Sequence, residues 1–184
     1  MTGRLIAVVG PSGAGKDTLL GRAVAQRPSL VLVRRVITRP EEAGGEPFEG
    51  VSVVEFEARK SRGAFALHWV AHGLSYGIPA MSTAQMAAGR TVLFNGSRAV
   101  LPRARMLFPE LGVVVVTADH ATLTARLRAR GRESGAALDR RLARADFAMP
   151  EGIPHAVVDN SVTVEDGVQA LVAVLDRLCG APRG

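Results

Sequence analysis

The sequence has few of the residues that mark secreted, metal-clustered or membrane-spanning proteins. Cys179 is the single cysteine among 184 residues, so the chain forms neither an internal disulfide nor a cysteine-based metal site. No apolar run approaches the roughly 18 residues that a membrane span requires. The apolar segment Leu5–Val9 is too short for a secretory signal. We therefore expect a cytoplasmic protein that does not act in a membrane.

Aromatic residues and lysines are also scarce. Aromatic residues make up 4% of the chain, and Lys16 and Lys60 are the only lysines, so arginine supplies nearly all of the cationic residues. A net charge of +6 favours anionic partners. Arginine suits bidentate contact with phosphate, although a GC-rich genome would give the same bias. The scarcity of aromatics and the lack of a nucleic-acid motif argue against a nucleic-acid binder.

Segments with strand and helix patterns alternate along the chain. The predicted strands are Leu5–Val9, Leu30–Val36, Phe65–Val70, Thr91–Phe94, Val113–Thr117 and Ala156–Val158. The predicted helices are Lys16–Gln26, Ser82–Ala88, Leu123–Arg130, Leu138–Phe147 and Val164–Leu178. Continuous apolar runs are typical of strands that are buried on both faces. The pattern predicts an α/β fold, with a mostly parallel sheet flanked by helices.

The segment of about residues 38–89 interrupts this alternation. It begins with a loop rich in proline and glycine, Thr38–Gly50, and continues with Ser52 and Glu55 at the spacing of a helix capping box. We interpret it as an inserted lobe within a single domain of residues 1–184.

A glycine-rich loop follows the first predicted strand and opens the first predicted helix. Its G-x4-G-K spacing directs backbone N–H groups and the helix N-terminus at phosphate groups, and Lys16 would reach the β- and γ-phosphates. The predicted nucleotide-binding residues are Gly10, Pro11, Ser12, Gly13, Ala14, Gly15, Lys16, Asp17 and Thr18. The loop alone does not separate a kinase from an ATPase or a GTPase.

Asp17 stands where such loops normally carry serine or threonine, whose hydroxyl binds Mg²⁺. A carboxylate is also a hard oxygen ligand, so we expect Asp17 to bind Mg²⁺ directly or through water. The alternative is that Asp17 only begins the helix, where its charge suits the helix dipole.

The ordered motifs resemble the guanylate kinase-like P-loop kinases and, within them, the ribose 1,5-bisphosphate phosphokinases of bacterial phosphonate metabolism. The resemblance covers nearly the whole chain and rests on Gly10–Thr18, Ile37–Pro40, Gly44–Glu46, Phe65–Trp69, Gly73–Ile78, Asn95–Arg98, Arg126–Arg132, Arg141–Ala145 and Asp159–Ser161. The sequence departs from guanylate kinases at His68, where a base-reading glutamate is usual, and at Asn95, where an aspartate is usual. A tyrosine expected near Ser52–Val54 is also missing.

The resemblance implies an ATP-dependent, Mg²⁺-requiring phosphotransfer to ribose 1,5-bisphosphate, which gives 5-phospho-α-D-ribosyl 1-diphosphate (PRPP). It makes the inserted lobe an acceptor-binding lobe and implies acceptor-binding roles for Arg39, His68, Tyr76, Asn95 and Arg98. Tyr76 is expected in a loop turn, and His68 could equally be an ordinary core or edge histidine.

Arginines late in the chain flank a predicted lid at about residues 131–138. Arg126 and Arg130 share a helix face, and the resemblance adds Arg141, so these three are predicted to neutralise the transferring phosphoryl group. The alternative is a solvated basic helix face. By resemblance, Asn160 lies near the adenine.

Two other functions remain open from the sequence. One is a guanylate, or nucleoside monophosphate, kinase. The other is a non-catalytic nucleotide-binding module, which typically lacks the loop lysine that Lys16 supplies. For the kinase that the resemblance implies, we expect ATP and a small phosphorylated sugar as partners, no nucleic acid or membrane, and a monomer or homodimer.

Overall fold

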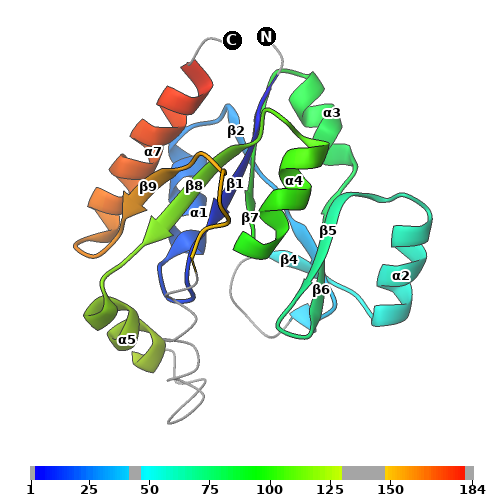
Figure 1. The fold of residues 1–184 in the computed structure, drawn as a ribbon, viewed down its shortest axis with the longest axis horizontal. Helices are drawn as coiled ribbons and strands as arrows, with labels where there is room; N and C mark the ends of the chain where they lie inside the picture. The colour runs from blue at the N-terminus through cyan, green and yellow to red at the C-terminus, as the bar shows by residue number, and fades with distance from the viewer. Residues whose placement is uncertain (1–2, 42–46, 130–147, 181–184) are drawn as a thin grey trace.

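The computed structural model describes residues 3–41, 47–129 and 148–180, which form two sheets with flanking helices (Figure 1). The larger sheet has the order β2-β7-β1-β8-β9, and all of its pairings are parallel. Its strands are β1 (Leu5–Val9), β2 (Leu30–Leu32), β7 (Thr91–Asn95), β8 (Gly112–Thr117) and β9 (Ala156–Asp159). The predicted α/β class with a mostly parallel sheet is confirmed.

Strand β1 is central, and every one of its residues is buried. Because successive strand residues point to opposite faces, Ile6 and Val8 join one core and Leu5, Ala7 and Val9 join another. The first core also contains buried residues of α1 (Lys16–Gln26) and α7 (Val164–Gly180). The second contains α4 (Leu101–Leu107) and residues of the smaller sheet. Burial on both faces explains the continuous apolar runs of these strands.

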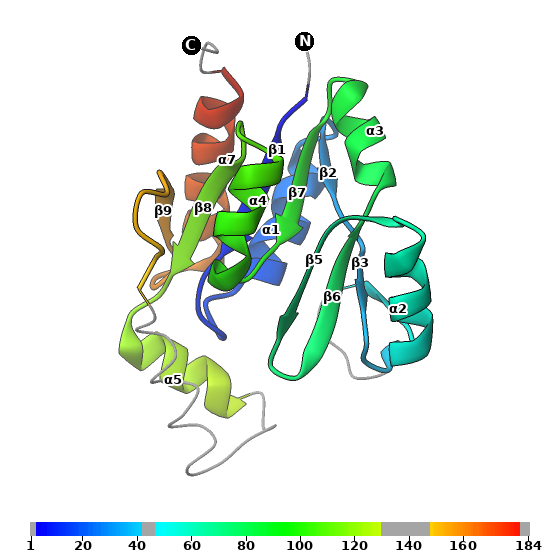
Figure 2. The ribbon, with the colours of Figure 1, turned by 45° about the vertical axis from the view of Figure 1, so that its right-hand side comes forward.

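The smaller sheet lies beside the larger one and comes from a single stretch of the chain (Figure 2). Its order is β4-β3-β6-β5, with strands β3 (Arg35–Ile37), β4 (Phe48–Gly50), β5 (Phe65–Ala71) and β6 (Leu74–Pro79). The remaining described helices are α2 (Val53–Ser61), α3 (Met81–Ala87), the 3₁₀ helix Arg98–Val100 and α5 (His120–Ala129). None of the helices in the described ranges is both long and apolar enough to cross a bilayer.

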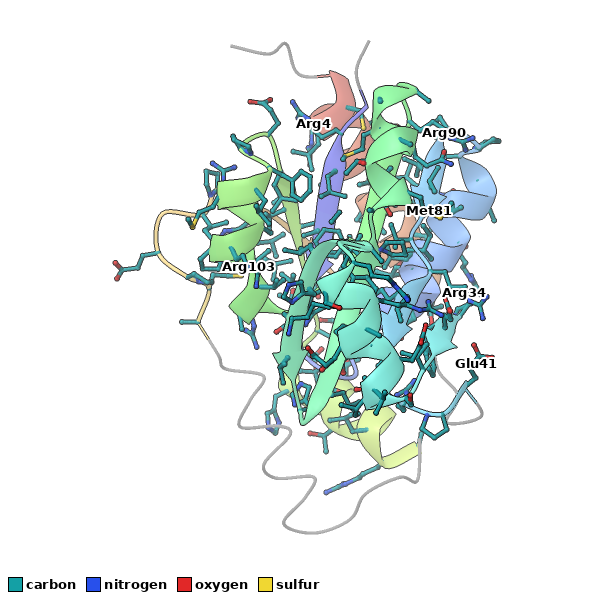
Figure 3. The ribbon with its side chains drawn as sticks, turned by 90° about the vertical axis from the view of Figure 1, so that its right-hand side faces the viewer. Arg4, Arg34, Glu41, Met81, Arg90 and Arg103 are labelled. Atoms are coloured by element: carbon teal, nitrogen blue, oxygen red, sulfur yellow. The ribbon has the colours of Figure 1, made fainter. Side chains whose placement is uncertain are left out.

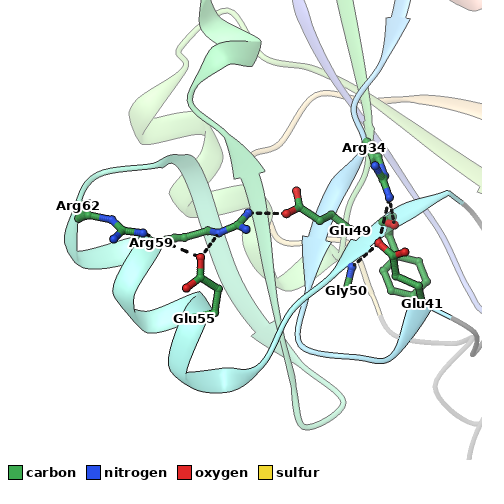
Figure 4. A network of polar contacts seen from close by, with 8 residues as sticks. Arg34, Glu41, Glu49, Gly50, Glu55, Arg59 and Arg62 are labelled. Carbon is green, nitrogen blue, oxygen red and sulfur yellow. Dashed lines mark hydrogen bonds and ion pairs between the residues drawn. The ribbon is translucent and has the colours of Figure 1, made fainter.

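Polar contacts attach α2 to the smaller sheet (Figure 4). The Arg59 guanidinium lies 2.7 Å from Glu55 on its own helix and 2.7 Å from Glu49 on β4. Helix α2 begins as its sequence predicts, since the Ser52 hydroxyl accepts a hydrogen bond from the Glu55 N–H at 3.1 Å. The ion pairs are partly exposed and each adds little stability, so they mainly fix the position of α2.

The predicted single strand Leu30–Val36 is wrong. The chain leaves the larger sheet after Leu32 and enters the smaller one at Arg35, so one apolar run supplies the two strands β2 and β3. The Val33 N–H still bonds to the Leu93 carbonyl, at 2.9 Å, and the separation occurs at Arg34. A run of β-branched residues does not reveal which partner each half will choose.

Three further elements differ from the prediction. Tyr76 lies inside β6, because the turn is formed by His72 and Gly73, whose φ values of 54° and 74° suit a two-residue hairpin. Strand β4 lies within the predicted loop, and α4 has no predicted counterpart. The predicted helix Leu138–Phe147 lies outside the described residues.

Helix α7 approaches the phosphate loop through Gly167. The buried Asn160 follows β9, and its side-chain amide donates a hydrogen bond to the Ala14 carbonyl at 2.7 Å. A Cβ built on Gly167 would overlap the Asn160 Oδ1 and lie 3.1 Å from Leu19 Cδ2. Glycine therefore permits a close approach that any larger residue would prevent.

We predict that Gly167→Ala lowers the free energy of unfolding by about 1–3 kcal/mol, because the added methyl group forces Asn160 or α7 to move. Gly21→Ala is the matched control, since Gly21 lies on the exposed side of α1 with nothing within 4 Å of its Cβ position. It should stabilise the protein by up to about 1 kcal/mol. Urea unfolding of both variants checks this, and equal effects would contradict the packing argument.

Candidate active site

The phosphate loop connects β1 to α1 and requires glycine at two positions in particular. Gly10 has a φ of 146°, and a Cβ there would overlap the Val116 carbonyl oxygen. Gly15 precedes α1 with a φ of 89°, and a Cβ there would lie 2.5 Å from the Asn160 side chain. The loop can therefore wrap tightly only with these residues. Its N–H groups and the start of α1 form the kind of concave surface that binds phosphate.

The Lys16 ammonium lies over the loop. Its Nζ donates hydrogen bonds to the carbonyl oxygens of Gly10 and Pro11, at 2.9 Å each. Lys16 also lines a cleft of about 470 Å³, which lies within the usual size range of small-molecule sites. The loop, strand β3, the β5–β6 hairpin and the segment after β7 form its walls.

Positive charge dominates this cleft. Within the described part of the chain, Lys16, Arg35 and Arg98 line it together with one carboxylate, Asp17. Burial lowers the pKa of Arg35 to about 10, while the nearby Tyr76 and Asp17 act in the opposite direction. Burial also lowers the pKa of Arg98. Near neutral pH the cleft therefore presents a buried arginine charge to an anionic ligand.

Asn95, at the end of β7, holds Asp17 in place. The Asn95 Nδ2 donates a hydrogen bond to Asp17 Oδ1 at 2.5 Å. Mg²⁺ in kinase sites is typically held by one or two carboxylates together with phosphate oxygens and water. A fixed carboxylate that lines the cleft beside the phosphate loop is a donor of this kind. The residues present therefore fit Mg²⁺.

Aromatic side chains form another wall of the cleft. Tyr76 stacks on Trp69, with ring centroids 5.2 Å apart and an interplanar angle of 9°. The Arg35 guanidinium lies 5.1 Å from the centre of the Tyr76 ring. Trp69 was not among the predicted site residues, and neither was Arg35. The alternation of strand β5 is the signal that would have found Trp69, since Leu67 and Trp69 both join the core beside the cleft.

His68, one residue earlier on β5, does not line the cleft. Its Nε2 lies 3.2 Å from Arg103 Nη2 of α4, a helix that faces the hairpin (Figure 3). The predicted acceptor-binding role of His68 therefore stays a prediction. Arg39 is also absent from the lining, and its guanidinium lies 4.4 Å from the centre of the Phe48 ring.

Arg126 approaches the phosphate loop from α5. Its Nη1 is buried without a hydrogen-bond partner in the described part of the chain. A Cβ built on Gly15 would lie 3.8 Å from that atom. Thr18 lies on the exposed side of α1. Arg130, Arg141 and the predicted lid at about residues 131–138 lie outside the described residues.

Asn160 supports the loop from behind. Its side-chain amide bonds to Ala14, and its backbone N–H donates to the Thr117 carbonyl at 2.9 Å. These contacts hold the loop carbonyl in position.

The structure thus brings the phosphate loop, Asp17, Tyr76, Asn95 and Arg98 into one cleft. It leaves Arg39 and His68 outside the lining. The same cleft contains Arg35 and Trp69, which sequence reasoning missed.

Known proteins are similar to this chain over nearly its whole length. No family model matches it. The chain is 48% identical over 175 residues to ribose 1,5-bisphosphate phosphokinase PhnN of a Ruegeria species, across 94% of this chain and 92% of the relative. It belongs to the ribose 1,5-bisphosphate phosphokinase family. The enzyme of the same name from Agrobacterium fabrum is 45% identical over 180 residues, across 96% of this chain and 98% of the relative.

A solved structure shows the same fold. Guanylate kinase from Anaplasma phagocytophilum superposes with a TM-score of 0.74 and 16% sequence identity, across 98% of this chain and 88% of the other. This likeness supports the guanylate kinase-like fold of the family.

We predict that the pKa of His68 lies below its ordinary value, because partial burial and the nearby positive charges of Arg103 and Lys60 disfavour the imidazolium. The imidazole of His68 then binds a proton less readily in the folded protein than in the unfolded chain. The contribution of His68 to the free energy of unfolding therefore falls as the pH decreases from about 6.5 toward the folded-state pKa.

An NMR titration of the imidazole checks this. Arg103→Gln should raise the pKa of His68, whereas Arg105→Gln, on the same helix, should leave it unchanged. A pKa that is the same in wild type and Arg103→Gln would contradict the contact.

Proposed function

We propose that this protein transfers the γ-phosphoryl group of ATP to ribose 1,5-bisphosphate, giving PRPP and ADP. The observation that carries the proposal is 48% identity, over nearly the whole chain, to a ribose 1,5-bisphosphate phosphokinase. The phosphate loop and the basic cleft next to it agree with a nucleotide and a phosphorylated acceptor. A kinase works where ATP is made, so the proposal includes a cytoplasmic reaction.

The phosphoryl transfer requires positioning of the two substrates and neutralisation of phosphate charge. An oxygen of the acceptor's 1-phosphate attacks the γ-phosphorus of ATP, and the bond from that phosphorus to the β–γ bridging oxygen breaks. The acceptor phosphate is already ionised near neutral pH, so the step needs no strong general base. Catalysis then comes from in-line positioning and charge neutralisation.

The nucleotide side of the cleft supplies most of that neutralisation. The loop N–H groups would bind the β-phosphate, and Lys16 would exchange its carbonyl partners for β- and γ-phosphate oxygens. Asp17 would hold Mg²⁺, which would supply further neutralisation of the phosphate charge. The buried Nη1 of Arg126 is directed at the loop and is suited to a phosphate oxygen. Arg130, Arg141 and the lid remain part of this proposal through family resemblance.

The acceptor side differs from the sequence-based proposal. Tyr76 and Arg98 line the cleft and keep their proposed acceptor roles. The Asn95 amide is bonded to Asp17, so Asn95 positions the carboxylate. Arg39 and His68 face other side chains and have no direct acceptor role in this proposal. The inserted lobe, about residues 38–89, would contribute the aromatic wall.

The acceptor identity is tested by incubating the protein with Mg-ATP and, separately, ribose 1,5-bisphosphate, GMP, AMP or no acceptor. ADP release should be fast only with ribose 1,5-bisphosphate, and phosphorus NMR should show a new diphosphate. A cleft without a base-reading group should disfavour GMP by factors that reach about 10⁴. Lys16→Ala is the control for adventitious kinase and should lose about 3 kcal/mol in kcat/KM. Faster turnover of GMP would make the protein a guanylate kinase, and no ADP with any acceptor would favour a binding module.

We further predict that Asp17→Asn raises the magnesium concentration for half-maximal activity severalfold. The substitution keeps the size and one oxygen but removes the charge that attracts the ion. Asp176→Asn removes an exposed carboxylate that pairs with Arg27 on the far end of α1, and it should leave the magnesium requirement unchanged. Equal magnesium titrations for Asp17→Asn and wild type would reduce Asp17 to a helix-start residue.

A further inference from the structure

Arg35 is a buried cation in the wall of the cleft. It begins β3 directly after the chain has left the larger sheet, and only 7% of its surface is exposed. Its Nη1 donates a hydrogen bond to the Asn95 carbonyl at 2.7 Å. The neighbouring Arg34 points outward instead, with 61% of its side chain exposed and an ion pair to Glu41 (Figures 3 and 4). Arg35 therefore lines the cleft, whereas Arg34 lies at the surface.

The side chain is held by three adjacent strands. Tyr76 on β6 pairs in register with Ile37 on β3 and with Trp69 on β5. Arg35 is two residues before Ile37 and so shares its face of the sheet. The guanidinium lies over the Tyr76 ring, which in turn stacks on Trp69. Phosphate binds the N–H edges of a guanidinium, so a contact with an aromatic ring and a contact with phosphate can form together.

Arg35 also lies close to the point of transfer. Asn95 accepts from Arg35 through its carbonyl and donates to Asp17 through its amide, so one residue ties both side chains together. Asp17 itself follows Lys16 at the start of α1. An anion that reached Arg35 would therefore be next to the γ-phosphate position rather than at the outer rim of the cleft.

Charge balance indicates what binds there. The described cleft lining has Lys16, Arg35 and Arg98 against the single carboxylate of Asp17. A guanidinium forms charged, two-pronged hydrogen bonds with phosphate oxygens. The loop N–H groups and Lys16 would bind the nucleotide phosphates. Arg35 lies on the side of the smaller sheet, where its guanidinium suits the phosphate group of a second ligand.

We propose that Arg35 binds the phosphate of the acceptor that receives the phosphoryl group, and that it selects for a phosphorylated acceptor. This inference rests on the proposed function. Arg35 would align the phosphate oxygen with the γ-phosphorus while Tyr76 and Trp69 fix the guanidinium plane. Sequence reasoning assigned the corresponding role to Arg39, which instead lies over Phe48.

The test compares Arg35→Met, Arg35→Lys and the matched control Arg34→Met. Arg35→Met should raise the KM for ribose 1,5-bisphosphate by about tenfold to one-hundredfold, the loss expected for charged hydrogen bonds. The Kd for Mg-ATP, measured by calorimetry, should stay within about twofold of wild type. Arg35→Lys keeps the charge but not the two-pronged geometry and should give an intermediate KM. Arg34→Met should match wild type throughout.

Several outcomes would overturn the proposal. An unchanged KM for the acceptor in folded Arg35→Met is one. An equal loss of Mg-ATP binding is another, because it would make Arg35 only a support for Asn95. If Arg35→Met does not fold, the KM for ribose 1,5-bisphosphate and the Kd for Mg-ATP are compared between Arg35→Lys and wild type. An unchanged KM, or an equal loss in both constants, then overturns the proposal.

Wild-type protein that does not phosphorylate ribose 1,5-bisphosphate would refute the proposed function separately. Arg35 is then tested by titrating inorganic phosphate into the Mg-ADP-loaded protein. Binding that is weakened in Arg35→Lys and retained in Arg34→Met supports the phosphate site, and equal binding in both overturns it.

Discussion

The arrangement of the cleft depends on the two hydrogen bonds of Asn95. Its carbonyl accepts from Arg35 on the smaller sheet, and its side-chain amide donates to Asp17 at the start of α1. Asn95 itself ends β7, next to the central strand. A single buried residue therefore joins both sheets and the helix that follows the phosphate loop. Such a shared partner fixes the distance between the two cationic sides of the cleft.

A second asparagine, Asn160, supports the phosphate loop from behind. Asn160 follows β9 and bonds to the Ala14 carbonyl. Its side chain fits against α7 only because Gly167 has no Cβ. The loop is thus supported from the rear while Asp17 is held from the front. Both asparagines follow parallel strands at the same edge of the sheet, where α/β proteins bind their ligands. Pre-organisation of this kind lowers the cost of binding a highly charged nucleotide.

Local pattern was sufficient for the parts of the fold that are buried on both faces. The phosphate loop, the helix Lys16–Gln26 and the strands around β1 follow from glycine spacing and continuous apolar runs. Pattern failed where an element's partner lies far away in the chain. The apolar run from Leu30 divides between two sheets, and this division buries Arg35 and exposes Arg34. Nothing within the run specifies that choice.

The candidate site shows the same limit at the level of single side chains. Motif position suggested His68, but strand alternation directs Trp69 toward the cleft and His68 toward α4. The prediction for Arg39 rests on its place after a strand in the acceptor-binding lobe, and its guanidinium lies over the Phe48 ring. Residue type indicates which reactions the side chains of a chain can support. The face of the sheet to which each side chain points depends on strand register, and a shift of one residue reverses it.

The origin of the smaller sheet in one continuous stretch separates the two substrates in sequence as well as in space. The loop and α1 that would bind the nucleotide belong to the larger sheet. The proposed acceptor wall comes from β3, β5 and β6. Substitutions within residues 35–79, the stretch that forms the smaller sheet, would therefore change what is phosphorylated while leaving the nucleotide-binding loop intact. A fold built in this way can change its acceptor one strand at a time, and exchanging this stretch between relatives is a direct route to new specificities.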